Sequence, residues 1–375
     1  IATTGADELN LLCSMTAHGI NPNIHTIARI CNPDYTDQVY KMQKTFSLSL
    51  TVNPEKQAAI EIERLLKFPG FLKRDSFAKG RVEIVELRVD ERSRLCNVAL
   101  SELNRVIKCR VLVCAVLRRG DVVAPDGSFV LREGDRIFVT ASTESLATLL
   151  DNLGIITKKV NHVMICGGGR VSYYLAQQLE KDGMTVRLIE KDPKHCEELA
   201  ALLPKTEIIN DDASNTFVLK RENIESCDAL VTATGMDELN MIISLYGTKH
   251  GVSQVITKLG HMENGSMIDQ LPIGSTIWPK DLCCNGIVRY IRAMHNQTGA
   301  AVSVHSIADG KAEAIEFHVE EKKPYCDKPL KNMKVKQNIL VSCITHGGVT
   351  ELPGGDSVIR EGDTVVVVTT RNDII

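Results

Sequence analysis

Residues 162–172, HVMICGGGRVS, decide the fold of this chain. A short apolar run ends in three glycines, and a helical pattern with Leu175 and Leu179 on one face follows. An apolar run, a glycine turn and a helix in this order are typical of the phosphate-binding turn of a βαβ unit. Small residues there let the backbone approach a pyrophosphate, while the start of the helix offers free N–H groups and the positive end of its dipole.

The spacing Gly167-x-Gly169-x-x-Ser172 matches a dinucleotide fingerprint, apart from the serine at its third position. We expect this serine to affect the packing of the helix on the strand more than the approach of a phosphate. Glu190 comes about 20 residues later, at the end of the next apolar run, where a carboxylate accepts hydrogen bonds from ribose hydroxyls. Such an acid favours a ribose without a 2′-phosphate. The alternative is a tight turn that binds no ligand.

Apolar runs alternate with helical patterns after the glycine turn. Strand-like runs cover residues 162–166, 185–189, 207–210, 229–233 and 254–257. Gly183 lies where a helix C-terminal cap is expected, and a longer helix from Pro279 to about Met294 closes the domain. Strands separated by helices of this length predict an α/β fold with a doubly wound, Rossmann-like parallel sheet.

The chain also repeats itself. Residues 1–10 match 231–240, residues 51–54 match 276–279, and residues 131–135 match 359–363. The near-constant offset of about 230 residues indicates one repeat, duplicated in tandem. The glycine turn occurs only in the second repeat. We therefore expect the chain to begin inside its first repeat, about 70 residues past the start of that repeat.

Each repeat ends in a β-rich segment with turns that contain glycine and proline. Strand-like runs lie at residues 82–89, 111–117 and 136–139, and again at 312–320, 339–344 and 364–368. A helix over residues 142–153 links the two repeats. We predict four domains: a partial Rossmann-like domain at 1–78, a small β-rich α+β domain with the linking helix at 79–158, a complete Rossmann-like domain at 159–298 and a second β-rich domain at 299–375.

Further candidate ligand-binding residues follow the strand-like runs, because ligands bind at the carboxyl ends of the strands in open α/β sheets. Asp212 is one such candidate, and its alternative role is to cap the next helix. Arg170 is either a phosphate ligand or a solvated residue of the first helical turn. Arg29 matches Lys258, and both are candidates for a phosphate contact or for a surface salt bridge. The candidates from this edge are Asp212, Thr234, Gly235, Thr4, Gly5 and Arg29.

The composition excludes several classes of protein. The 44 basic and 47 acidic residues give a net charge of −3, without the basic surplus of a nucleic-acid binder. No apolar run approaches the roughly 20 residues that cross a bilayer. The length of 375 residues predicts several domains, and we expect a soluble cytoplasmic protein.

Catalytic and metal-binding patterns do not stand out. The 12 cysteines form neither a CxxC pair nor a regular framework, so we expect reduced, mostly buried thiols. Among the ten histidines, His195 and His250 fall on predicted helices, where we expect them to be solvated. A dehydrogenase needs a second domain that presents substrate and an acid or base to its cofactor. We find no such group, and therefore predict no catalytic residue, no metal site and no enzymatic activity.

Four motifs occur in the order found in RCK (KTN) domains with their TrkA-C partners, and the chain resembles those domains. The motifs are CGGGRV at 166–171, Asp212-Ala213, TGMDELN at 234–240 and the closing EGD at 361–363. The resemblance covers essentially the whole chain. The tandem arrangement is similar to that of the regulatory subunits of Trk-type bacterial potassium uptake systems, which implies gating of a potassium transporter through nucleotide-dependent conformational change. The implied ligands are NAD(H) and, in some members, ATP or ADP.

The resemblance also implies an assembly and a set of nucleotide contacts. The assembly is a homo-oligomer, a dimer or tetramer that forms a ring of RCK domains. It is peripheral on the inner face of the cell membrane, beneath a potassium-translocating membrane protein. The first site is incomplete here, since its glycine turn and acid are missing. The implied contacts are Gly167, Gly168, Gly169, Arg170, Val171, Glu190 and Thr234 in the second repeat, and Thr4, Gly5 and Arg29 in the first.

Two alternative functions stay open at this point. One is an RCK regulator of a different cation transporter, such as a potassium/proton antiporter. The other, favoured only by the fingerprint, is an NAD-dependent oxidoreductase. For the assembly, we expect pairing through the helices at 54–66 and 279–294, where Cys284, Val288, Ile291 and Met294 form an apolar stripe. The alternative is that this stripe packs on its own sheet.

Overall fold

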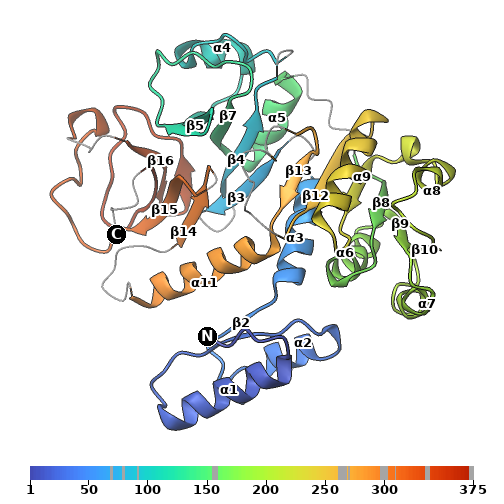
Figure 1. Cartoon of the computed structure of the whole chain (residues 1–375). Coiled ribbons are helices and arrows are strands. Elements are labelled where there is room, and N and C mark those ends of the chain that lie inside the picture. The colour runs from blue at the N-terminus through green and yellow to red at the C-terminus, as the bar shows by residue number, and fades with distance from the viewer. Residues whose placement is uncertain are drawn as a thin grey trace. The chain divides into compact units, whose positions relative to one another are not determined.

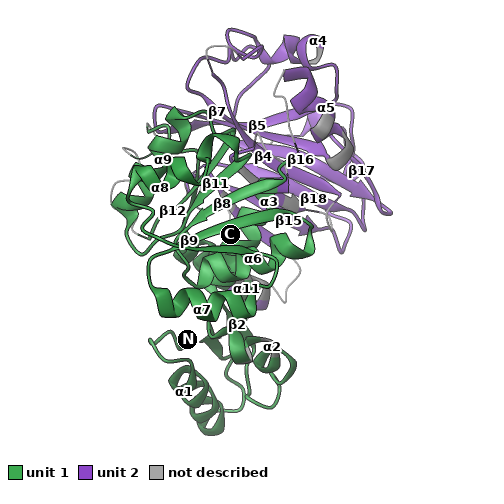
Figure 2. Cartoon of the chain, turned by 90° about the vertical axis from the view of Figure 1, so that its right-hand side faces the viewer, with its two compact units in different colours: residues 1–66, 160–290 green, residues 67–159, 291–375 purple. Residues whose placement is uncertain are grey.

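A computed structural model of the chain describes residues 1–67, 71–77, 81–90, 93–153, 159–260, 268, 271–295, 303–308, 310–333 and 338–370. These residues form two compact units, coloured separately in Figure 2. Unit 1 comprises residues 1–66 and 160–290, and unit 2 comprises residues 67–159 and 291–375. The chain therefore enters each unit twice, once from each repeat.

Unit 1 contains a six-stranded parallel sheet in the order β10-β9-β8-β11-β12-β13. This is the strand order of a Rossmann fold, and it confirms the predicted doubly wound sheet. The order reverses between β8 and β11, and the chain enters the sheet at its centre. The strands are β8 (His162–Cys166), β9 (Thr185–Glu190), β10 (Glu207–Asn210), β11 (Ala229–Thr232), β12 (Gln254–Lys258) and β13 (Ser275–Ile277).

Helices cover both faces of this sheet (Figure 1). Leu175 and Leu179 pack on one face, while Leu219 and Ile243 pack on the other. Gly183, at φ +76°, follows the end of α6, as its sequence position predicts. The helices are α6 (Arg170–Lys181), α7 (Pro193–Leu202), α8 (Thr216–Arg221), α9 (Asp237–Lys249) and α11 (Pro279–His295), with a short η3 at Ile224–Ser226.

The first repeat contributes a smaller Rossmann-like domain to unit 1. Strands β1 and β2 pair in parallel, and Ala2 forms a parallel bridge to Ala28 of β1. This pattern corresponds to β11, β12 and β13 of the second repeat. The elements are α1 (Asp7–Ile20), β1 (Ile27–Arg29), α2 (Pro33–Lys41), β2 (Leu50–Val52) and α3 (Pro54–Lys67).

The closing helices of the two Rossmann-like domains are exchanged. Helix α3 of the first domain shares a core with β8, β11 and α6 of the second, through Ala58, Ala59, Ile62, Leu65 and Leu66. In return, Cys283, Ile287 and Tyr290 of α11 pack with Ile27, Leu50 and Val52 of the first domain. The predicted stripe on α11 is not buried on its own sheet, since Val288 and Ile291 are 40% and 37% exposed. The two domains therefore complete each other's cores.

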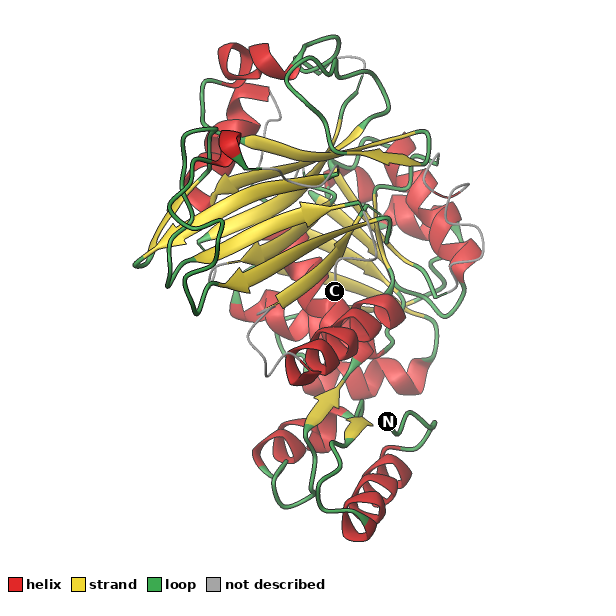
Figure 3. Ribbon diagram, turned by 90° about the vertical axis from the view of Figure 1, so that its left-hand side faces the viewer, coloured by secondary structure: helices red, strands yellow, loops and turns green. Residues whose placement is uncertain are grey.

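Unit 2 consists of two antiparallel sheets with the same topology, whose strands are yellow in Figure 3. Both sheets contain a register shift at the same place, between Val113 and Ala115 and between Val341 and Cys343. The first sheet has the order β3 (Lys73–Phe77), β4 (Val82–Arg88), β7 (Arg136–Ser142), β5 (Leu112–Arg118), β6 (Asp121–Val123). The second has the order β14 (Ser303–Ile307), β15 (Ala312–His318), β18 (Thr364–Thr369), β16 (Ile339–His346), β17 (Val349–Glu351).

The two sheets share a core and carry short helices at their periphery. Phe77 and Phe138 of the first sheet pack in one cluster with Ala314 and Val366 of the second. This shared core means that the two β-rich segments also fold as a pair. The helices are α4 (Leu103–Ile107), the linking helix α5 (Thr143–Leu153), η2 (Leu100–Glu102) and η4 (Leu330–Asn332).

Strand β3 shows where the sequence-based division differs from the structure. The boundary at residue 78 assigned Lys73–Phe77 to the first Rossmann-like domain, whereas β3 pairs with β4 in the antiparallel sheet. Three of its five residues are charged, and it lies at the edge of the sheet, where charged residues are common. A strand of this composition lacks the apolar alternation that sequence analysis detects.

Replacing Ile62 by alanine should destabilise unit 1, because this fully buried side chain joins α3 to the core of the second domain. A cavity at such a position costs about 2–5 kcal/mol. Ile60→Ala, on the same helix but 39% exposed, is the matched control and should cost under about 0.5 kcal/mol. Urea unfolding followed by the fluorescence of the single tryptophan, Trp278, measures both free energies. Equal effects would contradict the exchanged packing.

Candidate functional site

The glycine turn lies at the reversal point of the parallel sheet. Gly167 adopts φ +98°, a conformation that side chains disfavour, and its N–H donates to the carbonyl of Ile189 at 2.9 Å. A Cβ at Gly167 would lie 2.8 Å from the Cα of Thr234 and 2.9 Å from the carbonyl oxygen of Ala233. The end of β11 is thus in direct contact with the turn after β8. This brings together two of the segments that the sequence predicted to share a ligand.

Glu190 is held against the same turn. Its Oε2 accepts a 2.7 Å hydrogen bond from the N–H of Gly168, and its Oε1 accepts one of 2.9 Å from the N–H of Asp192. A Cβ at Gly168 would lie 2.9 Å from Oε2 of Glu190 and 2.8 Å from Leu199. Only glycine leaves room for this approach. Each carboxylate oxygen keeps a second lone pair, which is the acceptor that a ribose hydroxyl needs.

Gly169 begins helix α6 and is the open side of the turn. It is the N-cap residue, with no side-chain cap, and no atom lies within 4 Å of the position that its Cβ would take. The first N–H groups of a helix have no intrahelical acceptor, so this end suits an anion. Val171 is buried, so it can offer a ligand only its backbone. Ser172 is fully buried, with no hydrogen-bond partner for its Oγ, as expected of a residue that packs the helix on the sheet.

The run after β11 is organised by Asn240. Its Oδ1 accepts from the N–H of Thr234 at 2.8 Å and from the Thr234 hydroxyl at 2.7 Å, and its Nδ2 donates to the carbonyl of Lys258 at 2.9 Å. The ammonium group of Lys258 donates to the carbonyl of Thr234 at 2.8 Å, and burial lowers the pKa of this lysine. This fixes the segment that contains Thr234 and Gly235 beside the glycine turn.

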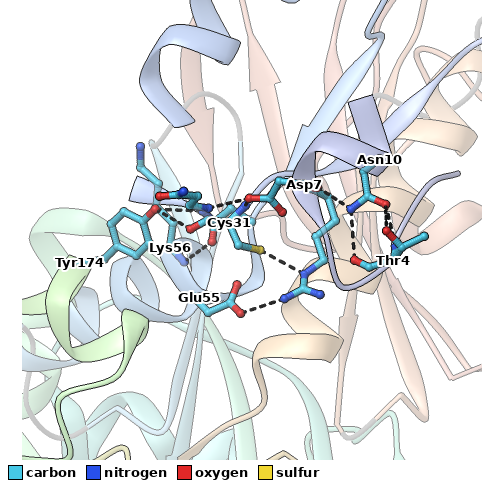
Figure 4. A network of polar contacts seen from close by, with 10 residues as sticks. Thr4, Asp7, Asn10, Cys31, Glu55, Lys56 and Tyr174 are labelled. Carbon is cyan, nitrogen blue, oxygen red and sulfur yellow. Dashed lines mark hydrogen bonds and ion pairs between the residues drawn. The ribbon is translucent and has the colours of Figure 1, made fainter. Parts of the chain in front are cut away.

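The first repeat builds the same network, shown in Figure 4. Asn10 accepts from the N–H of Thr4 at 2.7 Å and from its hydroxyl at 2.8 Å, and donates to the carbonyl of Arg29 at 2.9 Å. The Arg29 guanidinium pairs with Glu55 at 3.2 Å and donates to the sulfur of Cys31 at 3.1 Å. The salt bridge considered for Arg29 is therefore present, while Thr4 and Gly5 occupy the positions of Thr234 and Gly235.

Asp212 does not cap the following helix. Asn215 has that role, since its Oδ1 accepts from the N–H of Phe217 at 3.0 Å at the start of α8. Asp212 accepts instead from the N–H of Ser214 at 2.8 Å, which lowers the pKa of its carboxyl group. It follows β10, the outermost strand on this side of the sheet. The structure thus excludes the capping alternative.

His195 contacts the glycine turn, which sequence analysis missed. Its Nε2 lies 2.9 Å from the carbonyl oxygen of Gly168, and its Nδ1 lies 3.0 Å from Oε2 of Glu198. The hydrogen bond to Glu198 is the main cause that raises the pKa of His195. The fold brings the imidazole to the glycine turn, because helix α7 starts directly after the end of β9. The position of His195 in the first turn of the helix after Glu190 was the available signal.

The described residues contain neither a metal-binding cluster nor a membrane-spanning helix. Across the described ranges, no group of three or more histidine, cysteine, aspartate or glutamate side chains could hold a metal ion. In that part of the chain, no helix is long and apolar enough to cross a membrane. The 12 cysteines are all free thiols, and most of them are buried.

The fold and the site define a duplicated RCK-type protein, with two Rossmann-like domains that each precede a small antiparallel domain. The family model for the TrkA-N domain matches residues 1–48 and 163–279, and that for the TrkA-C domain matches residues 84–154 and 314–375. The chain belongs to the family of TrkA proteins, the RCK regulatory subunits of Trk systems.

Two TrkA proteins of other organisms are similar to this chain over nearly its whole length. The chain is 29% identical over 374 residues to the Trk system potassium uptake protein TrkA homolog 1 of Methanosarcina mazei, covering 98% of this chain and 82% of that protein. It is 27% identical over 375 residues to the Trk system potassium uptake protein TrkA of Haemophilus influenzae, covering 98% and 80% of the two chains.

Solved structures share the fold. The GsuK RCK domain superposes with a TM-score of 0.59 at 14% identity, covering 97% of this chain and 76% of that one. The GsuK channel bound to NAD gives a TM-score of 0.57 at 14% identity, covering 97% of this chain and 63% of the channel. At this identity the likeness concerns the fold alone.

Gly167→Ala should lower the stability of the nucleotide-free protein by about 1–3 kcal/mol, because it forces a side chain into positive φ and against the backbone of Thr234. Gly169→Ala should leave the stability unchanged within about 0.5 kcal/mol, since its Cβ meets open space. Thermal unfolding of the two variants without any ligand tests this difference. An unchanged stability of Gly167→Ala would mean that a side chain at this position does not collide with the backbone after β11.

Proposed function

We propose that this protein is a nucleotide-binding regulatory subunit that gates a membrane potassium uptake transporter. The observation that carries the proposal is the arrangement of Gly167, Gly168 and Gly169 between Glu190 and the end of β11. It combines an uncapped helix start for phosphates with a carboxylate for a ribose at the reversal point of the sheet. An adenine nucleotide without a 2′-phosphate fits this combination, namely NAD(H), ATP or ADP.

The residues present fit such a nucleotide. The backbone of Gly167 to Val171 would hold the phosphates, with Arg170 beside them, and Glu190 would hold the ribose hydroxyls. Thr234 lies against the turn and Gly235 follows it, while Asp212 follows an outer strand at the same edge of the sheet. In this proposal Thr4, Gly5 and Arg29 occupy the equivalent positions of the first repeat. A bound nucleotide supplies negative charge and hydrogen-bonding groups, and the protein's part is to recognise them.

Regulation, rather than catalysis, is the use of nucleotide binding that the packing supports. Helix α6 begins at the glycine turn, and one turn later the hydroxyl of Tyr174 donates to the carbonyl of Cys31 in the first domain at 3.0 Å. The same hydroxyl lies 3.3 Å from Nδ2 of Asn53. A ligand at the start of α6 therefore acts on a helix that is bonded to the other domain. Binding can shift the arrangement of the domains by as much as its affinities for the two arrangements differ.

The membrane partner is inferred from the family and from the surface. The relatives that cover most of this chain are named as Trk system potassium uptake proteins. We infer a cytoplasmic position, peripheral on the membrane that holds the transporter, and no enzymatic activity. The exposed side chains of Cys284, Val288 and Ile291 on α11 suit contact with another copy of the chain. A ring of such copies would transmit the domain movement to the transporter.

Gly169→Val should abolish nucleotide binding in a folded protein, because its branched side chain would fill the open space at the start of α6. Glu190→Ala should weaken binding by about 1–3 kcal/mol through loss of a charged acceptor. Calorimetric titration with NADH, NAD, ATP and ADP measures both effects. The control is Gly354→Val, at a glycine of unit 2 with equally open surroundings. Unchanged affinity in Gly169→Val would exclude this turn as the nucleotide site.

Exchange of the bound nucleotide should change potassium flux when the protein is reconstituted with its transporter in vesicles. Typical couplings between two sites are about 1–3 kcal/mol, which corresponds to roughly 5- to 150-fold changes in an equilibrium. The Gly169→Val protein should leave the flux insensitive to every nucleotide. A flux that stays constant under all nucleotides that bind the wild-type protein would reduce the ligand to a structural role.

A further inference from the structure

The peptides of the glycine turn are each fixed by a different side chain. Glu190 accepts from the N–H of Gly168 at 2.7 Å, which orients the peptide between Gly167 and Gly168. His195 faces the carbonyl oxygen of Gly168 at 2.9 Å, which orients the next peptide, between Gly168 and Gly169. Glycine has the widest choice of backbone conformations, so without such contacts both peptides would be free to rotate.

The second of these contacts controls the direction of the Gly169 N–H. In a planar trans peptide the C=O and the N–H point in opposite directions. The chain has no cis peptide bond among its described residues, so this rule applies between Gly168 and Gly169. When the Gly168 carbonyl is bonded to His195 on α7, the Gly169 N–H is directed away from α7. It then joins the first N–H groups of α6, where the proposed function places the phosphates.

Both ring nitrogens of His195 face hydrogen-bond acceptors. Nε2 faces a carbonyl oxygen and Nδ1 faces the carboxylate of Glu198, and both of these groups are acceptors. A neutral imidazole has one N–H and can satisfy only one of them, whereas an imidazolium satisfies both. The charged groups that act on the ring are Glu198 on the same helix and Glu190 on β9, and both are acidic.

We propose that His195 is a positioning residue of the nucleotide site, which in its protonated form holds the Gly168–Gly169 peptide so that the Gly169 N–H faces a phosphate. This inference rests on the proposed function, and deepens it by linking nucleotide affinity to the protonation of one side chain. Its neighbours already raise the pKa of His195, above all through the hydrogen bond to Glu198. A bound pyrophosphate adds negative charge and raises that pKa further.

The sign of the pH dependence follows from this direction. A raised pKa means that both hydrogen bonds of His195 are formed at pH values below the pKa of an ordinary histidine, and that one of the two is lost as the pH rises through the raised pKa. Since the nucleotide-bound form holds its proton more tightly, affinity for the nucleotide should fall as the pH rises. His195 is partly exposed, so solvent weakens this linkage and the change stays moderate.

Titration with NADH between about pH 6 and 8.5 tests the inference, because an ordinary histidine changes its charge there. Wild-type affinity should fall roughly 3- to 10-fold across this range. In His195→Gln, one amide N–H that does not titrate can replace Nε2, so binding should persist with a flat pH profile. The matched control is His250→Gln, whose imidazole pairs with Glu225 at 2.8 Å at the far end of α9, and it should keep the wild-type slope.

A second measurement follows the turn without any nucleotide. His195→Ala should speed hydrogen exchange at the amides of Gly168 and Gly169 relative to the wild type, and His195→Gln should restore most of the protection. A wild-type pH slope that survives in His195→Gln, or exchange that is equal in all three proteins, would overturn the role of His195 while leaving nucleotide binding intact. Absence of NADH binding at every pH would instead refute the proposed function, and the linkage with it.

Discussion

The apolar face of α3 is the contact on which the rest of unit 1 depends. This helix belongs to the first Rossmann-like domain but lies in the core of the second, beside β8 and α6. Without it, the sheet that carries the glycine turn would expose a wide apolar surface to water. Burial of several aliphatic side chains at such a place is worth several kcal/mol. The first domain is therefore a structural part of the site, and not merely a neighbour of it.

Duplication has kept the framework and changed individual contacts. Asn10 and Asn240 hold equivalent strand ends with nearly equal distances, although the two segments lie about 230 residues apart. In the antiparallel sheets, the buried Asp135 pairs with Arg118, whereas Asp363 pairs with His346 at the corresponding position. The same position of the fold therefore holds a guanidinium in one repeat and an imidazole in the other. The two β-rich domains thus share one framework and differ in the side chain that pairs with a buried aspartate.

The proposed nucleotide site is built mainly from backbone, and its side chains act by fixing that backbone. Glu190 and His195 each hold one peptide of the turn, while Asn240 fixes the segment beside it. Helix α6 then connects the turn to the first domain through Tyr174. In the proposed function, the same helix would offer its first N–H groups to a phosphate and one side chain to another domain, so ligand binding and domain arrangement would share one rigid element. This would give the proposed regulator a physical route from ligand to assembly.

Local patterns in the sequence determined most strands of the Rossmann-like sheet, the glycine turn and the three central strands of each antiparallel domain, because each depends on residues close together in the chain. The duplication was visible as a match at an offset of about 230 residues. Asn240 in the TGMDELN run was likewise visible as a motif. Tertiary structure alone decided which sheet each closing helix covers, since an amphipathic face is apolar without specifying its partner. It also brought His195 to Gly168 and placed the charged strand β3 in a sheet. These contacts join segments through the packing of the chain, and no local periodicity records them.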